Sequence, residues 1–264
     1  MDLGLKGRVA IVCASSQGLG KATATGFARE GAHVVICSRD TSKLDAAAQE
    51  IRREASSGTV FPVVADVSSA GQITNLVTET VAKFGRIDVL VTNAGGPPVG
   101  LFASLTDEQW EKGFSLNLMS TVRLIRAVVP EMQKRKWGRI INITSLTVKQ
   151  PLGDLIISSS IRPGIMGLSK ILSQQLGKDG ILINTVAPGY FLTARQKEIG
   201  VARAGARGIS VEAYLAEQAK DIPVGRLGDP EELANAIVFL ASEKASYISG
   251  TVMAIDGGTI RGIF

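Results

Sequence analysis

Residues 9–31 read VAIVC, ASSQGLG and KATATGFAREG, and they predict a strand, a tight turn and a helix in that order. VAIVC is a short apolar run, as is typical of a parallel strand buried on both faces. Gly20 would let the helix pack close to the strand, and Gly18 would let the backbone approach a ligand. The free N–H groups that start the helix favour a phosphate. The stretch therefore predicts a nucleotide site, with a purely structural turn as the alternative.

The rest of the chain alternates buried strands with helices. Further strands are predicted at 33–38, 60–66, 87–92, 139–145, 181–188 and 251–256. Helices are predicted at about 41–55, 69–84, 106–135 with an interruption near Asn117, 161–176, 211–220, and after the capping sequence at 229–232. Short connections between such elements indicate parallel strands joined by right-handed crossovers. We expect an α/β fold, a doubly wound seven-stranded parallel sheet (Rossmann fold), forming a single domain over residues 1–264.

Composition narrows the class of protein. No linker, charge block, signal-like segment or membrane-length apolar run divides the 264 residues, so we expect a soluble, cytoplasmic protein without a membrane partner. The net charge of +5 includes the basic cluster 134–139, which reads as a helix end and not as a nucleic-acid site. Cys13 and Cys37 end neighbouring strands; we expect free buried thiols, with a disulfide as the alternative. No cluster has metal-ligand spacing, so no metal is predicted, and His33 reads as structural.

Several motifs follow the predicted strands, at the edge where doubly wound sheets bind ligands. They are ASSQGLG at 14–20, Asp66-Val67, TNAG at 92–95, Asn117, Ser145, APGYFLT at 187–193 and IDGG at 255–258. Through these motifs the chain resembles the short-chain dehydrogenase/reductase family over nearly its whole length, and its tail from RLGDPEELA onward is most similar to the 3-oxoacyl-carrier-protein-reductase-like branch. The resemblance implies a dinucleotide laid across the strand ends and a small-molecule carbonyl or alcohol substrate.

The resemblance and the strand ends together give the candidate cofactor-binding residues. They are Ala14, Ser15, Ser16, Gln17, Gly18, Leu19, Gly20, Ser38, Arg39, Asp66, Val67, Asn93, Ala94, Gly95, Thr144, Arg162, Pro188, Gly189, Tyr190, Phe191 and Thr193. Arg39 suits a ribose 2′-phosphate by charge and fork geometry, so NADP(H) is predicted over NAD(H). Asp40 follows directly and could serve a ribose hydroxyl instead.

The chain departs from the family at its catalytic centre. The family has a tyrosine thirteen residues after the serine and a lysine four residues later, whereas counting from Ser145 reaches Ser158 and Arg162. A smaller departure is Ala14, where the family's turn usually opens with glycine. Serine is a far weaker acid than a phenol, and arginine stays protonated, so the proton route must be atypical. The candidate catalytic residues are Asn117, Ser145, Ser158, Arg162 and Tyr190.

Residues 191–228 lie where the family carries its substrate lid. We expect a short helix at 211–220, with Gly200, Gly205 and Gly208 as flexible points. The basic side chains of 195–207 suit an anionic substrate or carrier, and a solvated mobile loop is the alternative. The apolar composition of 156–176, including Ile156, Ile157 and Ile161, together with the resemblance, favours a homodimer or homotetramer.

Two functions of different class remain open. The first is an NADP(H)-dependent oxidoreductase that reduces a carbonyl (3-oxoacyl or similar) or oxidises an alcohol through an atypical proton-donor site. The second is a catalytically impaired dinucleotide-binding protein that acts as a sensor or assembly partner.

Overall fold

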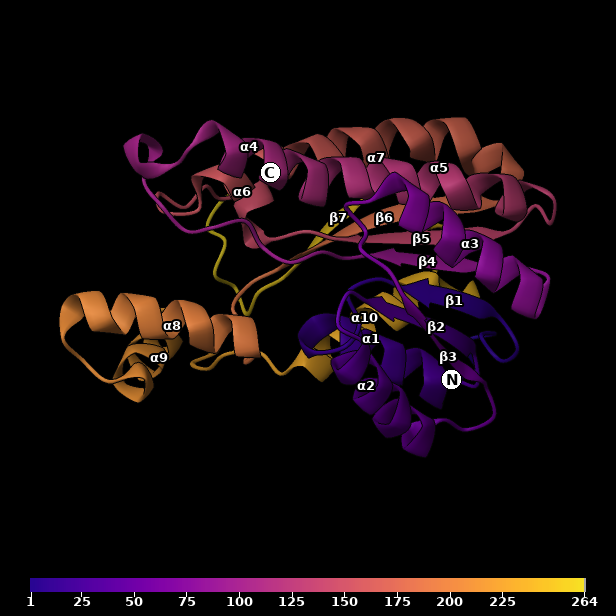
Figure 1. Ribbon diagram of the computed structural model, residues 1–264, viewed down its shortest axis with the longest axis horizontal. Coiled ribbons are helices and arrows are strands. Elements are labelled where there is room, and N and C mark those ends of the chain that lie inside the picture. The colour runs from indigo at the N-terminus through magenta and orange to yellow at the C-terminus, as the bar shows by residue number, and fades with distance from the viewer. Residues whose placement is uncertain (264) are drawn as a thin grey trace.

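The computed structural model describes residues 1–263 and contains a seven-stranded sheet with all strands parallel (Figure 1). The strands are β1 (Val9–Val12), β2 (His33–Ser38), β3 (Val60–Val64), β4 (Val89–Thr92), β5 (Gly138–Ile143), β6 (Ile181–Pro188) and β7 (Val252–Ile255). Their order is β3-β2-β1-β4-β5-β6-β7, so the winding direction reverses between β1 and β4. The predicted doubly wound fold is confirmed.

Helices cover both faces of the sheet (Figure 1). They are α1 (Gly18–Arg29), α2 (Thr41–Glu54), α3 (Ala70–Phe84), α4 (Asp107–Phe114), α5 (Ser120–Gln133), α6 (Ile156–Ile161), α7 (Pro163–Leu176), α8 (Ala194–Arg207), α9 (Val211–Lys220) and α10 (Pro230–Ala241). The helices α1, α2 and α10 pack on one face, and α3, α5 and α7 pack on the other. Within the described residues, none of these helices is both long and apolar enough to cross a membrane.

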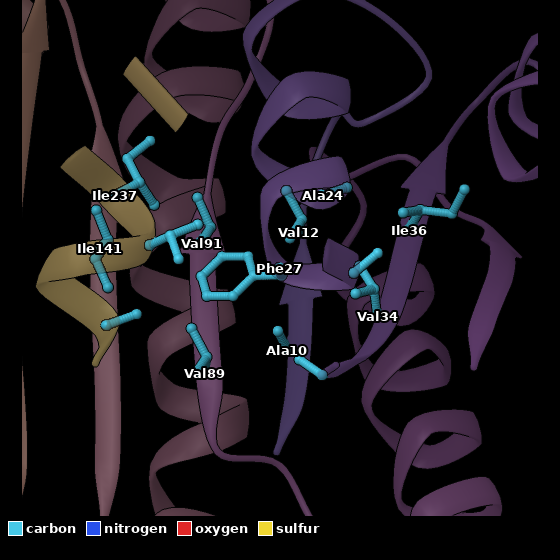
Figure 2. Packing of buried hydrophobic residues seen from close by; sticks show 14 of the residues in the cluster. Ala10, Val12, Ala24, Phe27, Val34, Ile36, Val89, Val91, Ile141 and Ile237 are labelled. Carbon is cyan, nitrogen blue, oxygen red and sulfur yellow. The ribbon is translucent and has the colours of Figure 1, made fainter. Parts of the chain in front are cut away.

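Strand β1 is apolar throughout because it contributes to both cores. Ala10 and Val12 face the core under α1, whereas Val9 and Ile11 face the core under α3 and α5. Figure 2 shows Phe27 of α1, which is fully buried, lying over β1 and β4 in the first core. Alternate side chains of a strand point to opposite faces, so a central strand between two helical layers needs a continuous apolar run.

The predicted helix ends are confirmed by their capping contacts. Asp40 Oδ1 accepts a 3.0 Å hydrogen bond from the Lys43 N–H at the start of α2. Asp229 and Glu232 form a capping box at the start of α10. Gly85 ends α3 with φ of 68°, in the left-handed region that favours glycine.

Two details of the sequence interpretation are wrong. The helix expected from 161 begins only at Pro163, after the separate short helix α6, because proline is well placed at the first helical position. The expected flexible glycines Gly200 and Gly205 lie inside α8, whose first turn is capped by the Thr193 side chain, and only Gly208 ends a helix. The apolar stretch 156–161 is not an exposed face, as its composition predicted, and part of it is covered within the chain, because Ile157 is fully buried against α4.

The two cysteines are free and buried, which confirms the expectation of thiols. Cys13 directly follows β1 and Cys37 lies near the end of the neighbouring strand β2, and the Cys37 Sγ is 4.0 Å from the Val12 carbonyl oxygen. The neighbouring Cys37 side chain and burial raise the pKa of Cys13 well above its ordinary value, so this thiol stays protonated at neutral pH.

Candidate active site

A cavity of about 630 Å³ lies at the carboxyl ends of the strands, where the winding of the sheet reverses. Its volume is in the range of small-molecule sites. Predicted cofactor residues that line it are Ala14, Ser16, Gln17, Gly18, Leu19, Ser38, Arg39, Asp66, Val67, Asn93, Ala94, Gly95, Thr144, Arg162, Pro188, Gly189, Phe191 and Thr193. The fold therefore gathers most of the candidates from distant parts of the chain into one site.

The glycine-rich turn has the shape of a phosphate cradle. A Cβ on Gly20 would overlap the carbonyl oxygen of Ala14, so only glycine fits there. Gly18 adopts φ of 56° and begins α1, and Gln17 places no side-chain cap on the first turn. The N–H groups of that turn are thus left for an anion at the positive end of the helix dipole.

The Ser15 side chain stabilises this turn through hydrogen bonds to the backbone of β1 and β2. Its hydroxyl donates to the Val12 carbonyl oxygen at 2.7 Å and accepts from the Cys37 N–H at 3.1 Å. Ser15 is fully buried and does not line the cavity, and neither does Gly20. Both residues shape the cradle without being among the residues that face a ligand.

The other branch of the cavity lies beside β2 and carries positive charge. The Arg39 guanidinium is 3.9 Å from Asp66 and its side chain is 73% exposed, which leaves it free to turn toward a ligand. Ser38 and Ser16 are joined through their hydroxyls at 3.1 Å. Lys43 also lines this end, although the sequence interpretation missed it; its position in the first turn of α2 was the available signal. Asp40, by contrast, uses one carboxylate oxygen to cap α2.

At the opposite end of the cavity, two serines flank the tip of β5. The Ser145 Oγ accepts a hydrogen bond from the Thr147 N–H at 3.2 Å, so its own hydroxyl proton remains available to a ligand. The Ser158 Oγ lies 2.9 Å from the Thr147 Oγ1, and both side chains are buried. Both serines line the cavity. The hydroxyls of Ser145 and Ser158 can hold and polarise a carbonyl oxygen.

Arg162 lies one helical turn beyond Ser158 and is only 6% exposed. Its Nη1 donates to the Thr144 carbonyl oxygen at 3.1 Å, and its buried Nε has no partner among the described residues. Burial lowers the pKa of Arg162 to about 10, which still leaves it a cation at neutral pH. No ion pair joins it to a carboxylate in the described part of the chain.

Asn117 and Tyr190 do not line this cavity. Asn117 is buried in the π-helical turn Ser115–Met119, where its Nδ2 donates to the Gly113 carbonyl oxygen at 3.1 Å and its Oδ1 has no described partner. Tyr190 lines a separate, smaller cavity with Val224 and Asp256, and burial raises the pKa of its hydroxyl. The structure therefore does not bring Tyr190 together with Ser145.

Helix α8, at the left in Figure 1, borders the cavity with its first turns. The Arg195 Nη2 donates to the Pro97 carbonyl oxygen at 3.1 Å, which links α8 to the loop after β4. The Arg203 Nε donates to Asp154 at 2.9 Å, and its Nη1 donates to the Tyr214 hydroxyl at 2.9 Å. Sequence reasoning gave these basic residues no individual partners, because those partners lie in distant segments.

Comparisons with known proteins find relatives that match nearly the whole chain. A family profile described as enoyl-(acyl carrier protein) reductase matches residues 13–259. The 3-oxoacyl-acyl-carrier-protein reductase FabG of Thermotoga maritima is 34% identical over 262 residues, covering 97% of this chain and 99% of that protein. The structure of L-sorbose reductase from Gluconobacter frateurii, complexed with NADPH and L-sorbose, is 35% identical with a TM-score of 0.95 and full coverage of both chains. The structure of a variant of actinorhodin polyketide ketoreductase with NADPH is 29% identical, has a TM-score of 0.92, and matches 97% of this chain and 98% of its own.

Proposed function

Because the chain belongs to the short-chain dehydrogenase/reductase family of oxidoreductases, we propose that it is an NADP(H)-dependent enzyme with an atypical proton-donor site. It reduces a carbonyl compound, of the 3-oxoacyl kind or similar, or oxidises the corresponding alcohol. The observation that carries this proposal is the continuous cavity that joins the glycine-rich turn to Ser145, Ser158 and Arg162.

The residues of the cavity fit a nicotinamide dinucleotide. The open first turn of α1 would hold the diphosphate. Arg39 and Lys43 would hold a 2′-phosphate, which favours NADP(H), since the capping role of Asp40 leaves it less available for a ribose hydroxyl. When bound, NADPH supplies the hydride that adds to the carbonyl carbon, and the carbonyl oxygen gains a proton to give the alcohol.

Ser145 and Arg162 would act on the carbonyl end. The Ser145 hydroxyl donates to the carbonyl oxygen, since its own oxygen is already supported by the Thr147 N–H. Arg162 takes the position of the family's lysine and Ser158 that of its tyrosine. As a permanent cation, Arg162 stabilises negative charge on oxygen and positions a ribose but transfers no proton.

The proton has two routes near this end. Thr147 and Ser158 share a hydrogen bond, so Thr147 can orient the Ser158 hydroxyl toward the substrate oxygen. A water held by the unpartnered Oδ1 of Asn117 is the second route, and it ranks below Ser158 because Asn117 lies outside the cavity lining. Tyr190, in its separate cavity, is the least favoured donor.

The test is NADPH oxidation with activated ketones and 3-oxoacyl thioesters, comparing the wild type with the Ser158→Tyr/Arg162→Lys double variant. Turnover by the wild type that the double variant does not improve supports the atypical site. A wild type that binds NADPH but is silent, beside an active double variant, would favour the alternative of a dinucleotide-binding sensor or assembly partner.

We further propose a homodimer or homotetramer that pairs through α7. Ile171 lies in this helix, and its side chain is 53% exposed. A large apolar side chain in that position is compatible with an interface between two copies.

A further inference from the structure

We propose that Arg203 is a positioning residue: together with Asp154 it forms a latch that holds α8 over the serine end of the cavity, where Ser145 and Ser158 lie. The effect of this latch on turnover rests on the proposed function. The latch itself rests on the hydrogen bonds and the burial of the residues that hold α8 in place.

Helices α8 and α9 form one packed unit, residues 194–220. The Gln196 Nε2 donates to the Gln218 Oε1 at 2.6 Å, and both side chains are buried between the two helices. A Cβ on Gly200 would lie 3.5 Å from the ring of Tyr214, so the helix backbones approach closely there. The two helices therefore hold each other in a fixed relation.

This unit joins the rest of the chain through two segments that pair with each other. The Gly228 N–H donates to the Tyr190 carbonyl oxygen at 2.9 Å, and the Leu192 N–H donates to the Gly228 carbonyl oxygen at 2.9 Å. Both connections thus leave the body of the protein at one place, and α8 and α9 lie together at the left of Figure 1. Arg203 is about 14 Å along the helix axis from Ala194 at the start of α8. Contacts this far from the base of the unit have the longest lever on the position of α8.

One face of α8 is turned toward the cavity. Arg195, Ile199 and Arg203 are spaced by four residues, so they follow one another along one side of the helix. Arg195 and Ile199 line the cavity. Arg203 therefore continues the cavity-facing side of α8 by one more turn.

Arg203 attaches this face to the wall of the cavity. Its Nε and Nη2 donate to the Asp154 Oδ2 at 2.9 and 2.5 Å, and its Nη1 donates to the Tyr214 hydroxyl of α9 at 2.9 Å. The Asp154 carbonyl oxygen accepts from the Gly100 N–H at 2.9 Å, and the next residue, Leu155, lines the cavity. The side chains of Arg203 and Asp154 are 22% and 35% exposed, so their ion pair is partly shielded from water and less screened than an exposed pair.

A second ion pair of α8 provides the contrast. The Arg207 Nη2 lies 2.7 Å from the Glu217 carboxylate, which belongs to α9. This pair connects two parts of the same unit, so its loss leaves the attachment to the cavity wall intact. Arg203 and Arg207 are matched in residue type and helix, and they differ in what they attach.

The distance between α8 and the loop after β4 tests the latch without relying on turnover. Spin labels on Val201→Cys and Leu101→Cys report it by pulsed electron paramagnetic resonance; both positions are exposed, whereas Cys13 and Cys37 are fully buried. We expect the ligand-free protein to show one main distance.

Four variants are compared in this doubly labelled protein. Arg203→Gln and Asp154→Asn should each raise the fraction with a longer distance about 10-fold, as for the loss of one charged hydrogen bond. Arg203→Lys, which keeps the charge, should fall between them and the parent protein. Arg207→Gln is the matched control and should not change the distance distribution.

Unchanged distances in both Arg203→Gln and Asp154→Asn overturn the latch, and so does an equal change in Arg207→Gln. If Arg203→Gln does not fold, Asp154→Asn and Arg203→Lys still decide the question.

Steady-state kinetics then separates the latch from the proposed reaction. Arg203→Gln should raise KM for the ketone or thioester by up to about 10-fold and keep kcat within about twofold, because Ser145 and Ser158 are untouched. An unchanged KM beside a longer distance removes the positioning role in the reaction. A longer distance in a protein that reduces no carbonyl keeps the latch and removes the proposed reductase.

Discussion

The Ser158 hydroxyl oxygen lies 2.9 Å from the Thr147 hydroxyl oxygen, and both side chains are buried at the serine end of the cavity. Thr147 Oγ1 has no other hydrogen bond to a described side chain, so its role there is to orient Ser158. The contact links the turn that follows β5 to α6.

If Ser158 carries the proton, Ser158→Ala should lower kcat by about 100-fold, the lower range for loss of a positioned proton donor. Thr147→Val should lower kcat by about 3- to 10-fold, the equivalent of one net hydrogen bond. The double variant should be no worse than Ser158→Ala alone, because Thr147 acts through Ser158. Steady-state kinetics of the four proteins measures this, and additive losses would contradict it.

Tyr190 should not be the proton donor. Tyr190→Phe is expected to keep kcat within about twofold of the wild type, because the phenol lies in the smaller cavity. Burial disfavours the phenolate and raises its pKa, so the charged form appears only above the ordinary value near pH 10. A difference titration at ultraviolet wavelengths, wild type minus Tyr190→Phe, should show an ionisation whose midpoint lies above that pH. A large loss of kcat in this variant would reinstate Tyr190 as a donor.

Arg39 and Lys43 should determine the choice of dinucleotide. Arg39→Ala is expected to weaken NADPH binding by about 10- to 100-fold, the range for a charged hydrogen bond to phosphate, while NADH binding changes little. Lys43→Ala should act in the same direction with a smaller effect. Fluorescence titration with both cofactors measures the ratio, and Arg53→Ala, on the exposed side of α2, is the charge-matched control. An unchanged ratio in Arg39→Ala would remove the assignment to NADP(H).

The buried charge of Arg162 should lower stability when no ligand is bound. Arg162→Met is expected to raise the free energy of unfolding by about 1–3 kcal/mol at neutral pH, because it removes an uncompensated buried cation. For a chain of this size that corresponds to a rise in Tm of roughly 2–4 °C per kcal/mol. Thermal denaturation of the ligand-free proteins checks the sign. A lower Tm in the variant would mean that the hydrogen bond to Thr144 outweighs the unfavourable burial of the charge.

Ile171 should lie in the interface between copies of the chain. Ile171→Glu is expected to shift a dimer or tetramer toward smaller species, because a carboxylate would have to be buried in the contact. Light scattering coupled to size-exclusion chromatography measures the mass of both proteins. Lys178→Glu, which changes charge beyond the end of α7, is the control. An unchanged mass for Ile171→Glu would place the interface elsewhere.

The sequence by itself determined the fold of this protein. Each central strand carries a continuous apolar run because it packs between two helical layers, as β1 does with Ala10 on one core and Ile11 on the other. Local signals such as Asp40, Gly85 and Asp229 fixed helix ends, because capping involves residues only a few positions apart. The rule that ligands bind at strand ends then located the cavity.

Only the tertiary structure decided the environment of each side chain in that cavity. Arg162 is buried, and Tyr190 is kept apart from Ser145 in a second cavity. Lys43 comes to line the main cavity. Each of these placements depends on segments that lie far apart in the sequence. Helix α8 was missed because its glycines weaken the local helical signal, whereas contacts such as Arg203 with Asp154 hold it in place. Burial, charge compensation and hydrogen bonding depend on tertiary contacts, so local sequence patterns do not predict them.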